Sequence, residues 1–223
     1  MATQRGRDSR PLFLLPLACA VIPAVAISAA WWLSVRAGHI PDCIPHLEGC
    51  TSISRAARYG TGNVVFKALM IPCAFLHAAM WIEAQRWIRH RHADPGAGSS
   101  LRVLGIVAAA ALVLYAAFLG TEGAGYQWMR RFGTVFYFGA TVLAIFTFTH
   151  RLLQTDTEKT IARVMLALCG LLLALGLASV GTRAIEGDPD LKDRLEDILE
   201  WHLGTLLVLW PLCLAVLWRR TGR

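Results

Sequence analysis

Four acidic side chains near the carboxyl end of the chain recur at helical spacing and are the best candidates for chemistry. Asp193, Glu196, Asp197 and Glu200 are separated by three and four residues, which places them along one stripe of a helix. The stripe runs into an apolar segment, so Glu200 lies where a helix would enter hydrocarbon. A carboxylate at that depth either stays among the headgroups or faces a polar cavity, where a cation, a basic side chain or a lipid headgroup meets it.

Further polar residues are expected at the same membrane interface. The candidates for a lipid headgroup site or polar cavity are Arg58, Lys67, Glu122, Arg130, Arg131, Glu200 and His202. We expect Glu122, Arg130, Arg131 and Glu200 to converge on one water-accessible cavity, with Lys67 pointing toward it. The reason is that isolated charges in hydrocarbon cost several kcal/mol. Such a cluster is either a headgroup site or a salt-bridge plug that closes the bundle, and the sequence leaves both interpretations open.

Catalysis at this cluster would need a general base with an orienting group, and for acyl transfer a nucleophile. Glu200 and His202 are two residues apart, which on a helix turns them by about 200°, so they cannot face one pocket unless the helix end frays. The serines expected in the same layer are Ser52 and Ser54, both in a loop. Whether the protein is an enzyme is therefore left open.

The elements that must position these residues are membrane helices. The chain has 223 residues, 56% of them hydrophobic and 17% charged, with a mean hydropathy of +0.49, which is outside the range of a soluble domain. Six apolar runs are close to the ~20 residues that span a bilayer. They cover residues 11–35, 61–85, 102–120, 132–150, 161–182 and 198–218. Because the connections are short, we predict an all-α polytopic membrane protein, with one six-transmembrane-helix bundle over residues 1–223.

The net charge of +7 reflects membrane topology. The basic residues form no groove-sized patch with interleaved aromatics, so we expect no nucleic-acid partner. With both termini in the cytoplasm, that side holds 13 of the 22 Lys and Arg residues and the other side holds 10 of the 15 acids. The 13 are Arg5, Arg7, Arg10, Arg86, Arg89, Arg91, Arg102, Arg151, Lys159, Arg163, Arg219, Arg220 and Arg223. The positive-inside rule therefore predicts both termini in the cytoplasm, in a membrane that the sequence does not specify.

The loop after the first span contains Cys43 and Cys50, seven positions apart. On the non-cytoplasmic side this pair can oxidise, so we predict a disulfide that closes the loop. His39 and His46 belong to the same loop, but the spacing matches no closed zinc pattern. We therefore expect no metal and no cofactor.

Small residues within two spans predict close helix packing. Gly133, Gly139 and Ala140 lie in the fourth span, and Gly170 and Gly176 lie in the fifth. Such residues let the backbones of neighbouring membrane helices approach each other.

Several short motifs resemble a family of six-span membrane proteins. These are GHIP at 38–41, SIS at 52–54, GTG at 60–62, VVF at 64–66 and EW at 200–201. They resemble the Frag, DRAM (damage-regulated autophagy modulator) and Sfk family, which also contains GPI-anchor lipid-remodelling factors and the N-terminal region of the cell-wall-hypersensitive ceramide-remodelling protein. The resemblance covers nearly the whole chain by span count and loop placement, and it implies a six-helix bundle that acts on or with membrane lipids.

The chain departs from the family pattern at two places. Arg55 stands where many relatives place an acid, and Arg130 with Arg131 stands where they place a His-Asp pair. Both changes add positive charge on the exterior face. Since guanidinium groups match phosphate oxygens, this favours an anionic phosphate headgroup bound among mixed charges.

Two classes of function follow. The first is an integral membrane protein that handles lipid at the exoplasmic face, by remodelling GPI anchors or phospholipids or by assisting that reaction. The second is a non-catalytic membrane factor that binds lipid or a partner protein in trafficking or autophagy. A b-type haem protein is disfavoured, because His77, His150 and His202 are expected at different depths.

Overall fold

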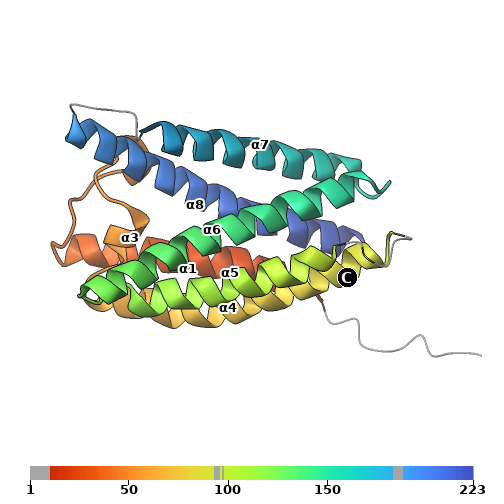
Figure 1. Ribbon diagram of the computed structural model, residues 1–223, viewed down its shortest axis with the longest axis horizontal. Helices are drawn as coiled ribbons and strands as arrows, with labels where there is room; N and C mark the ends of the chain where they lie inside the picture. Colours follow the sequence, from red (N-terminus) through yellow and green to blue (C-terminus); the bar gives the residue numbers. More distant parts are fainter. Residues whose placement is uncertain (1–10, 93–95, 97, 183–187, 223) are drawn as a thin grey trace, which may run out of the picture.

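The computed structural model describes residues 11–92, 96, 98–182 and 188–222, and in these ranges its regular structure is helical (Figure 1). Within this part of the chain, six helices are long and apolar enough to cross a membrane. They are α1 (Leu14–Arg36), α4 (Gly60–Arg89), α5 (Ser99–Phe118), α6 (Ala124–Leu153), α7 (Lys159–Gly181) and α8 (Pro189–Arg220). Two short helices, α2 (Pro45–Glu48) and α3 (Ile53–Ala56), lie between α1 and α4. The predicted all-α multi-pass membrane architecture is confirmed.

The six long helices alternate in direction, so the bundle has two distinct ends. We call one end the disulfide end; it holds residues 37–59, the α5–α6 turn and the start of α8. The other is the terminal end, where α8 finishes at Arg220. The N-terminal arginines behind the topology prediction, Arg5, Arg7 and Arg10, lie outside the described residues, as does Arg223.

Helix α8 starts nine residues before the predicted span, so the acidic stripe and the apolar segment form one continuous helix. Asp188 caps its start by accepting a hydrogen bond from the backbone N–H of Leu191 (2.9 Å), and Pro189 occupies the first turn. Proline is tolerated there because the first N–H groups of a helix have no intrahelical acceptor. Because α8 starts this early, the four carboxylates of the acidic stripe lie on the same helix as the membrane span.

The helices pack in chain order with two exceptions, the contact of α1 with α8 and a smaller contact of α4 with α6. Neighbours α4 and α5, α5 and α6, α6 and α7, and α7 and α8 are in contact, while α1 packs against both α4 and α8. Figure 1 shows that α6 and α7 are joined at the terminal end and diverge toward the disulfide end. Helices α6 and α8 share no extended contact. The bundle is therefore loosest between α6 and the α7–α8 pair at the disulfide end.

Large aromatic side chains fill the terminal half of the bundle. Trp81 and Trp210 stack with ring centroids 5.2 Å apart, and the edge of Phe148 meets Trp210 at 5.5 Å. The indole N–H of Trp210 donates to the Thr149 hydroxyl (3.3 Å). In a lipid solvent such packing stabilises through dispersion and close fit more than through removal of water. The tightly packed half of the protein is therefore the terminal half.

The small residues pack on only some of the faces that were predicted. A Cβ at Gly133 would lie 2.8 Å from the backbone nitrogen of Tyr115, so this glycine permits close approach of α6 to α5. Ala140 is also buried. The prediction is wrong for Gly139, Gly170 and Gly176, where an added Cβ would meet nothing within 4 Å. A small residue in a membrane helix does not by itself specify which face is packed.

The predicted disulfide between Cys43 and Cys50 is present. It closes a short loop with a sequence separation of seven. In the chain-entropy treatment such a loop contributes about 2.5 kcal/mol. The disulfide therefore constrains residues 43–50 within the segment 37–59, hereafter the disulfide loop, which carries α2 and α3.

Candidate functional site

A cavity of about 400 Å³ extends from the disulfide end into the bundle. Its walls come from α1, α3, α4, α5, α6, α7 and α8. Along α8 the lining residues run from Glu196 to Val208, a rise of roughly 18 Å at 1.5 Å per residue. The cavity is thus elongated along the bundle axis and lies beside the loosest helix contacts.

The polar end of the cavity is built around Glu200. Its carboxylate accepts a hydrogen bond from the backbone N–H of Ser54 (3.1 Å). Ser54 lies in the first turn of α3, where backbone N–H groups lack intrahelical acceptors and are free to donate outward. The Ser52 hydroxyl starts that turn by accepting from the Arg55 N–H (3.0 Å), and it also bonds the Ser54 hydroxyl (3.1 Å). The SIS motif therefore positions a backbone donor against the α8 carboxylate.

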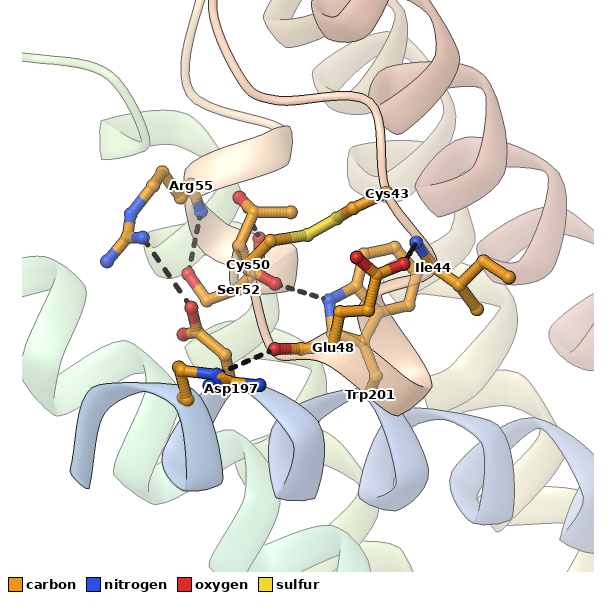
Figure 2. Close-up of a disulfide and its surroundings, with 10 residues drawn as sticks. Cys43, Ile44, Glu48, Cys50, Ser52, Arg55, Asp197 and Trp201 are labelled. Carbon is orange, nitrogen blue, oxygen red and sulfur yellow. Dashed lines mark hydrogen bonds and ion pairs between the residues drawn. A yellow bond between two sulfur atoms is a disulfide. The ribbon is translucent and has the colours of Figure 1, made fainter. Parts of the chain in front are cut away.

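The acidic stripe divides between the cavity and the outside. Glu196 lines the cavity and accepts a hydrogen bond from the Thr182 hydroxyl at the end of α7 (3.2 Å). Asp197 is buried on another face of α8 and pairs with Arg55 at 3.5 Å (Figure 2). Arg55 thus lies outside the cavity lining, although its charge still acts on Glu200.

His77 lines the deeper part of the cavity. It is 4% exposed, and neither ring nitrogen has a hydrogen-bond partner among the described residues. Its ring lies 6.4 Å from that of Tyr137, which also lines the cavity, and it is in electrostatic range of the Cys73 thiol one turn away. Buried polar groups are almost always hydrogen-bonded, so an unsatisfied imidazole at a cavity wall indicates a partner beyond the described residues of the chain, such as a ligand in the cavity.

The disulfide loop covers the same end of the bundle. The Trp201 indole N–H donates to the Thr51 carbonyl (2.8 Å), and the Arg194 guanidinium donates to the Glu48 carbonyl (3.1 Å). Figure 2 shows Trp201 projecting from α8 toward the loop. The loop is therefore tied to the helix that carries both cavity carboxylates.

His46 makes the second contact between the loop and α8. Its ring nitrogen hydrogen-bonds the Thr205 hydroxyl (3.0 Å), and its ring lies 5.3 Å from that of His202. Burial, followed by the charge of His202, lowers the pKa of His46 below its ordinary value. The folded protein therefore favours the neutral form of His46.

Among the seven residues predicted for the site, Glu200 lines this cavity. Arg58 and Arg130 lie within electrostatic range of Tyr115, a cavity residue, and Arg130 donates to the Thr121 carbonyl at the end of α5 (2.6 Å). Both arginines therefore stand outside the cavity lining. Whether they bind a headgroup stays a prediction.

The remaining candidates take separate positions. Glu122 and Arg131 are exposed, and Lys67 is half-buried on α4 outside the cavity lining. His202 is turned toward His46, as expected from the 200° separation between its position and that of Glu200. The carboxylate and the histidine of the last span thus face different surroundings.

Sequence reasoning did not assign Glu196, Ser54, Tyr115, Tyr137 and His77 to a common cavity. For Glu196 a signal existed, because it precedes Glu200 by four residues and shares its helix face. For the two tyrosines and His77 no local pattern distinguishes a cavity wall from a packed core. The described residues also hold no group of three or more His, Cys, Asp or Glu side chains that could bind a metal ion.

No protein-family model, curated protein or solved structure matches this chain.

Proposed function

We propose that this integral membrane protein binds a lipid in the cavity between its helices, with the headgroup at the Glu200 end. One observation carries the proposal: the carboxylate of Glu200, held by the Ser54 N–H, stands at one end of a cavity whose other walls are mainly apolar. The apolar lining includes Pro23, Ile27, Phe66, Met70, Leu112, Leu203, Leu207 and Val208. A polar head and an aliphatic tail are the chemistry that such a cavity complements.

The size of the cavity supports a lipid ligand. Small-molecule sites commonly measure about 300 to 1,000 Å³ and combine apolar walls with a few placed polar groups. This cavity has about 400 Å³ and includes Ser54, Glu196 and Glu200 as polar groups near the disulfide end. Its length along α8 suits a chain better than a compact metabolite.

The helix arrangement supports entry from the bilayer. Helix α6 contributes Thr134 and Phe138 to the cavity, and α7 contributes Ser179, yet α6 and α7 diverge at this end (Figure 1). A lipid could move sideways between them without crossing the aromatic core of the terminal half.

Two modes of lipid handling are compatible with this site. Remodelling of a GPI anchor or phospholipid would use Glu200 as a general base. A non-catalytic factor that presents or senses lipid, alone or with a partner protein, needs binding only. The Ser54 hydroxyl pairs with the Ser52 hydroxyl at 3.1 Å. Among the described residues no lysine lines the cavity, and the lining histidine, His77, lies on the deeper wall. This observation favours the binding mode.

The orientation proposed for the site is exoplasmic. The Cys43–Cys50 disulfide supports this orientation, because disulfides persist in oxidising compartments. The basic residues of the loops at the terminal end support it as well. The cavity would then open to the exoplasmic leaflet, with both termini in the cytoplasm.

Lipid that copurifies with the protein tests the proposal. Val208→Trp places a large ring in the cavity, whereas Val216→Trp adds the same ring on the exposed face of α8 two turns further on. After purification in mild detergent, mass spectrometry should find a bound lipid in the wild type and in Val216→Trp, and several-fold less in Val208→Trp. Equal lipid in all three folded proteins would rule out the cavity as the binding site.

The same preparations separate the two modes. Incubation with phospholipid vesicles should release no lyso-lipid or fatty acid if the protein only binds. Acyl release by the wild type that is lost in Glu200→Gln but kept in Glu122→Gln, an exposed carboxyl at the same end, would establish the enzymatic mode instead.

A further inference from the structure

We infer that the ligand of this cavity is a lipid whose head carries a protonated amine with N–H donors. The inference rests on the proposed lipid-binding function and specifies the class of lipid. It differs from the phosphate-binding headgroup site that the arginines suggested in the sequence, because it assigns the cavity carboxylates to the amine of the ligand.

The charged groups on the cavity wall are acidic. Glu196 and Glu200 line it, and among the described residues no lysine or arginine does. The arginine nearest in sequence to the Ser54 contact, Arg55, is paired with Asp197 outside the lining. Arg130 is committed to the carbonyl of Thr121. A ligand charge that enters this space therefore meets carboxylates first.

The two carboxylates retain unused capacity to accept hydrogen bonds. Glu200 accepts from the Ser54 N–H, with the Ile53 N–H beside it, and Glu196 accepts from the Thr182 hydroxyl. An ionised carboxylate has about four acceptor positions, and an alkylammonium offers three donors and no acceptor. Charge-assisted hydrogen bonds of this kind are roughly twice as strong as neutral ones. A primary ammonium therefore complements this end of the cavity, whereas an anionic head that lacks an ammonium would be repelled.

A second, independent feature indicates a ligand in the same cavity. His77, 4% exposed, has no hydrogen-bond partner for either ring nitrogen within the described structure. A hydrogen-bonding group partway along the ligand, such as an ester carbonyl or a hydroxyl, would complement His77 on the deeper wall. An amphiphile with an ammonium head and one such group further along satisfies both features.

Two common lipid classes share this chemistry: phosphatidylethanolamine, whose ammonium accompanies a phosphate, and free sphingoid bases, which lack the phosphate. The experiment uses wild-type protein in phosphatidylcholine nanodiscs, titrated separately with phosphatidylethanolamine, phosphatidylglycerol, sphingosine and N-acetylsphingosine. Binding is measured by native mass spectrometry. We expect the amine-bearing lipids, or one of them, to bind at least tenfold tighter than phosphatidylglycerol and than the acetylated base, which has lost the charge.

The variants assign the preference to the cavity. Glu200→Gln should reduce the preference for the amine to about twofold or less while binding of N-acetylsphingosine persists. Glu122→Gln should keep the preference. Preference for phosphatidylethanolamine alone would identify a zwitterionic phospholipid as the ligand, with its phosphate toward Arg58 and Arg130, the arginines in electrostatic range of Tyr115. Preference for sphingosine alone would identify a free sphingoid base.

Two results would overturn the inference, and they are distinguishable from failure of the proposed function. Equal binding of sphingosine and N-acetylsphingosine by the wild type, together with equal binding of the two phospholipids, refutes amine recognition but leaves lipid binding intact. Because that comparison uses unmutated protein, it does not depend on whether Glu200→Gln folds. If no lipid binds and Val208→Trp changes nothing, the proposed function itself fails.

Discussion

Replacement of Trp201 by Phe should loosen the disulfide loop from α8 and destabilise the protein. Trp201 is 7% exposed and packs with Ile40, Ile53 and Ala56. Its indole N–H donates to the carbonyl of Thr51, a residue that is 0% exposed. Phenylalanine keeps an aromatic ring in place but removes the donor, so a buried carbonyl loses its partner.

The expected cost has two parts. A buried acceptor left unsatisfied costs about 1 to 3 kcal/mol. The smaller ring leaves a partial void, for which we add about 1 kcal/mol. The sum is a loss of about 2 to 4 kcal/mol in the free energy of unfolding, and for a chain of this length each kcal/mol lowers Tm by roughly 2 to 4 °C.

The assay is thermal unfolding of the purified protein in detergent, with Trp32→Phe as the matched control. Trp32 is 51% exposed on α1 and makes a cation–π contact with Arg36 at 5.3 Å. The control should therefore change Tm by no more than about 2 °C, the equivalent of a weak exposed contact. Reduction of Cys43–Cys50 by a mild thiol should also be faster in Trp201→Phe, because the loop is less firmly held. If Trp201→Phe matches Trp32→Phe in both measurements, the indole does not anchor the loop.

Three further predictions concern the loop and the topology. Gly49→Ala should lower the free energy of unfolding by more than about 2 kcal/mol, because Gly49 has φ +60° and an added Cβ would lie 2.2 Å from the Arg194 carbonyl oxygen. The control Gly38→Ala, with φ +71° and no atom within 4 Å of the added Cβ, should cost only the left-handed backbone strain of about 1 to 2 kcal/mol. Equal losses of Tm in the two variants would contradict the clash at Gly49. Because the pKa of His46 is lowered in the folded protein, the unfolded chain binds a proton more readily, and the stability should be full above the ordinary pKa of 6.5 and decline as the pH falls through that value. Thermal melts at several pH values should show a smaller decline for His46→Gln. An undiminished decline in that variant would mean that other groups cause the loss. A membrane-impermeant maleimide should label Asp190→Cys at the disulfide end in intact cells and Asp156→Cys at the terminal end only after permeabilisation, and the reverse pattern would invert the topology.

Local patterns in the sequence were sufficient for the architecture. A helix in lipid must satisfy its backbone hydrogen bonds within itself, so runs of about 20 apolar residues specify spans without reference to the rest of the chain. The disulfide was also predictable, since Cys43 and Cys50 are close in sequence within one loop. The spacing of Glu196 and Glu200 placed both on one helix face, and the structure puts both on the cavity wall.

Side-chain partners across helices were decided only by the tertiary structure. Arg55 and Arg130 suggested a phosphate site by sequence, but one pairs with Asp197 and the other bonds the end of α5. The rotation of each helix about its axis determines such partners, and in lipid the hydrophobic pattern of a span does not fix that rotation, because both faces are apolar. For the same reason, the sequence does not reveal that Gly133 packs on α5 while Gly139 faces outward.

The cavity itself has no signature in the sequence. His77 and Tyr137 belong to apolar spans in which nothing in the sequence distinguishes a core position from a cavity position, and the packing of α4 and α6 places both on the cavity wall. At the terminal end, Trp81, Phe148 and Trp210 instead fill the space between α4, α6 and α8. The sequence by itself therefore determined which segments cross the membrane and which acids stand at its edge. The fit among the helices decided which of those acids share a cavity, because that fit depends on contacts between residues distant along the chain.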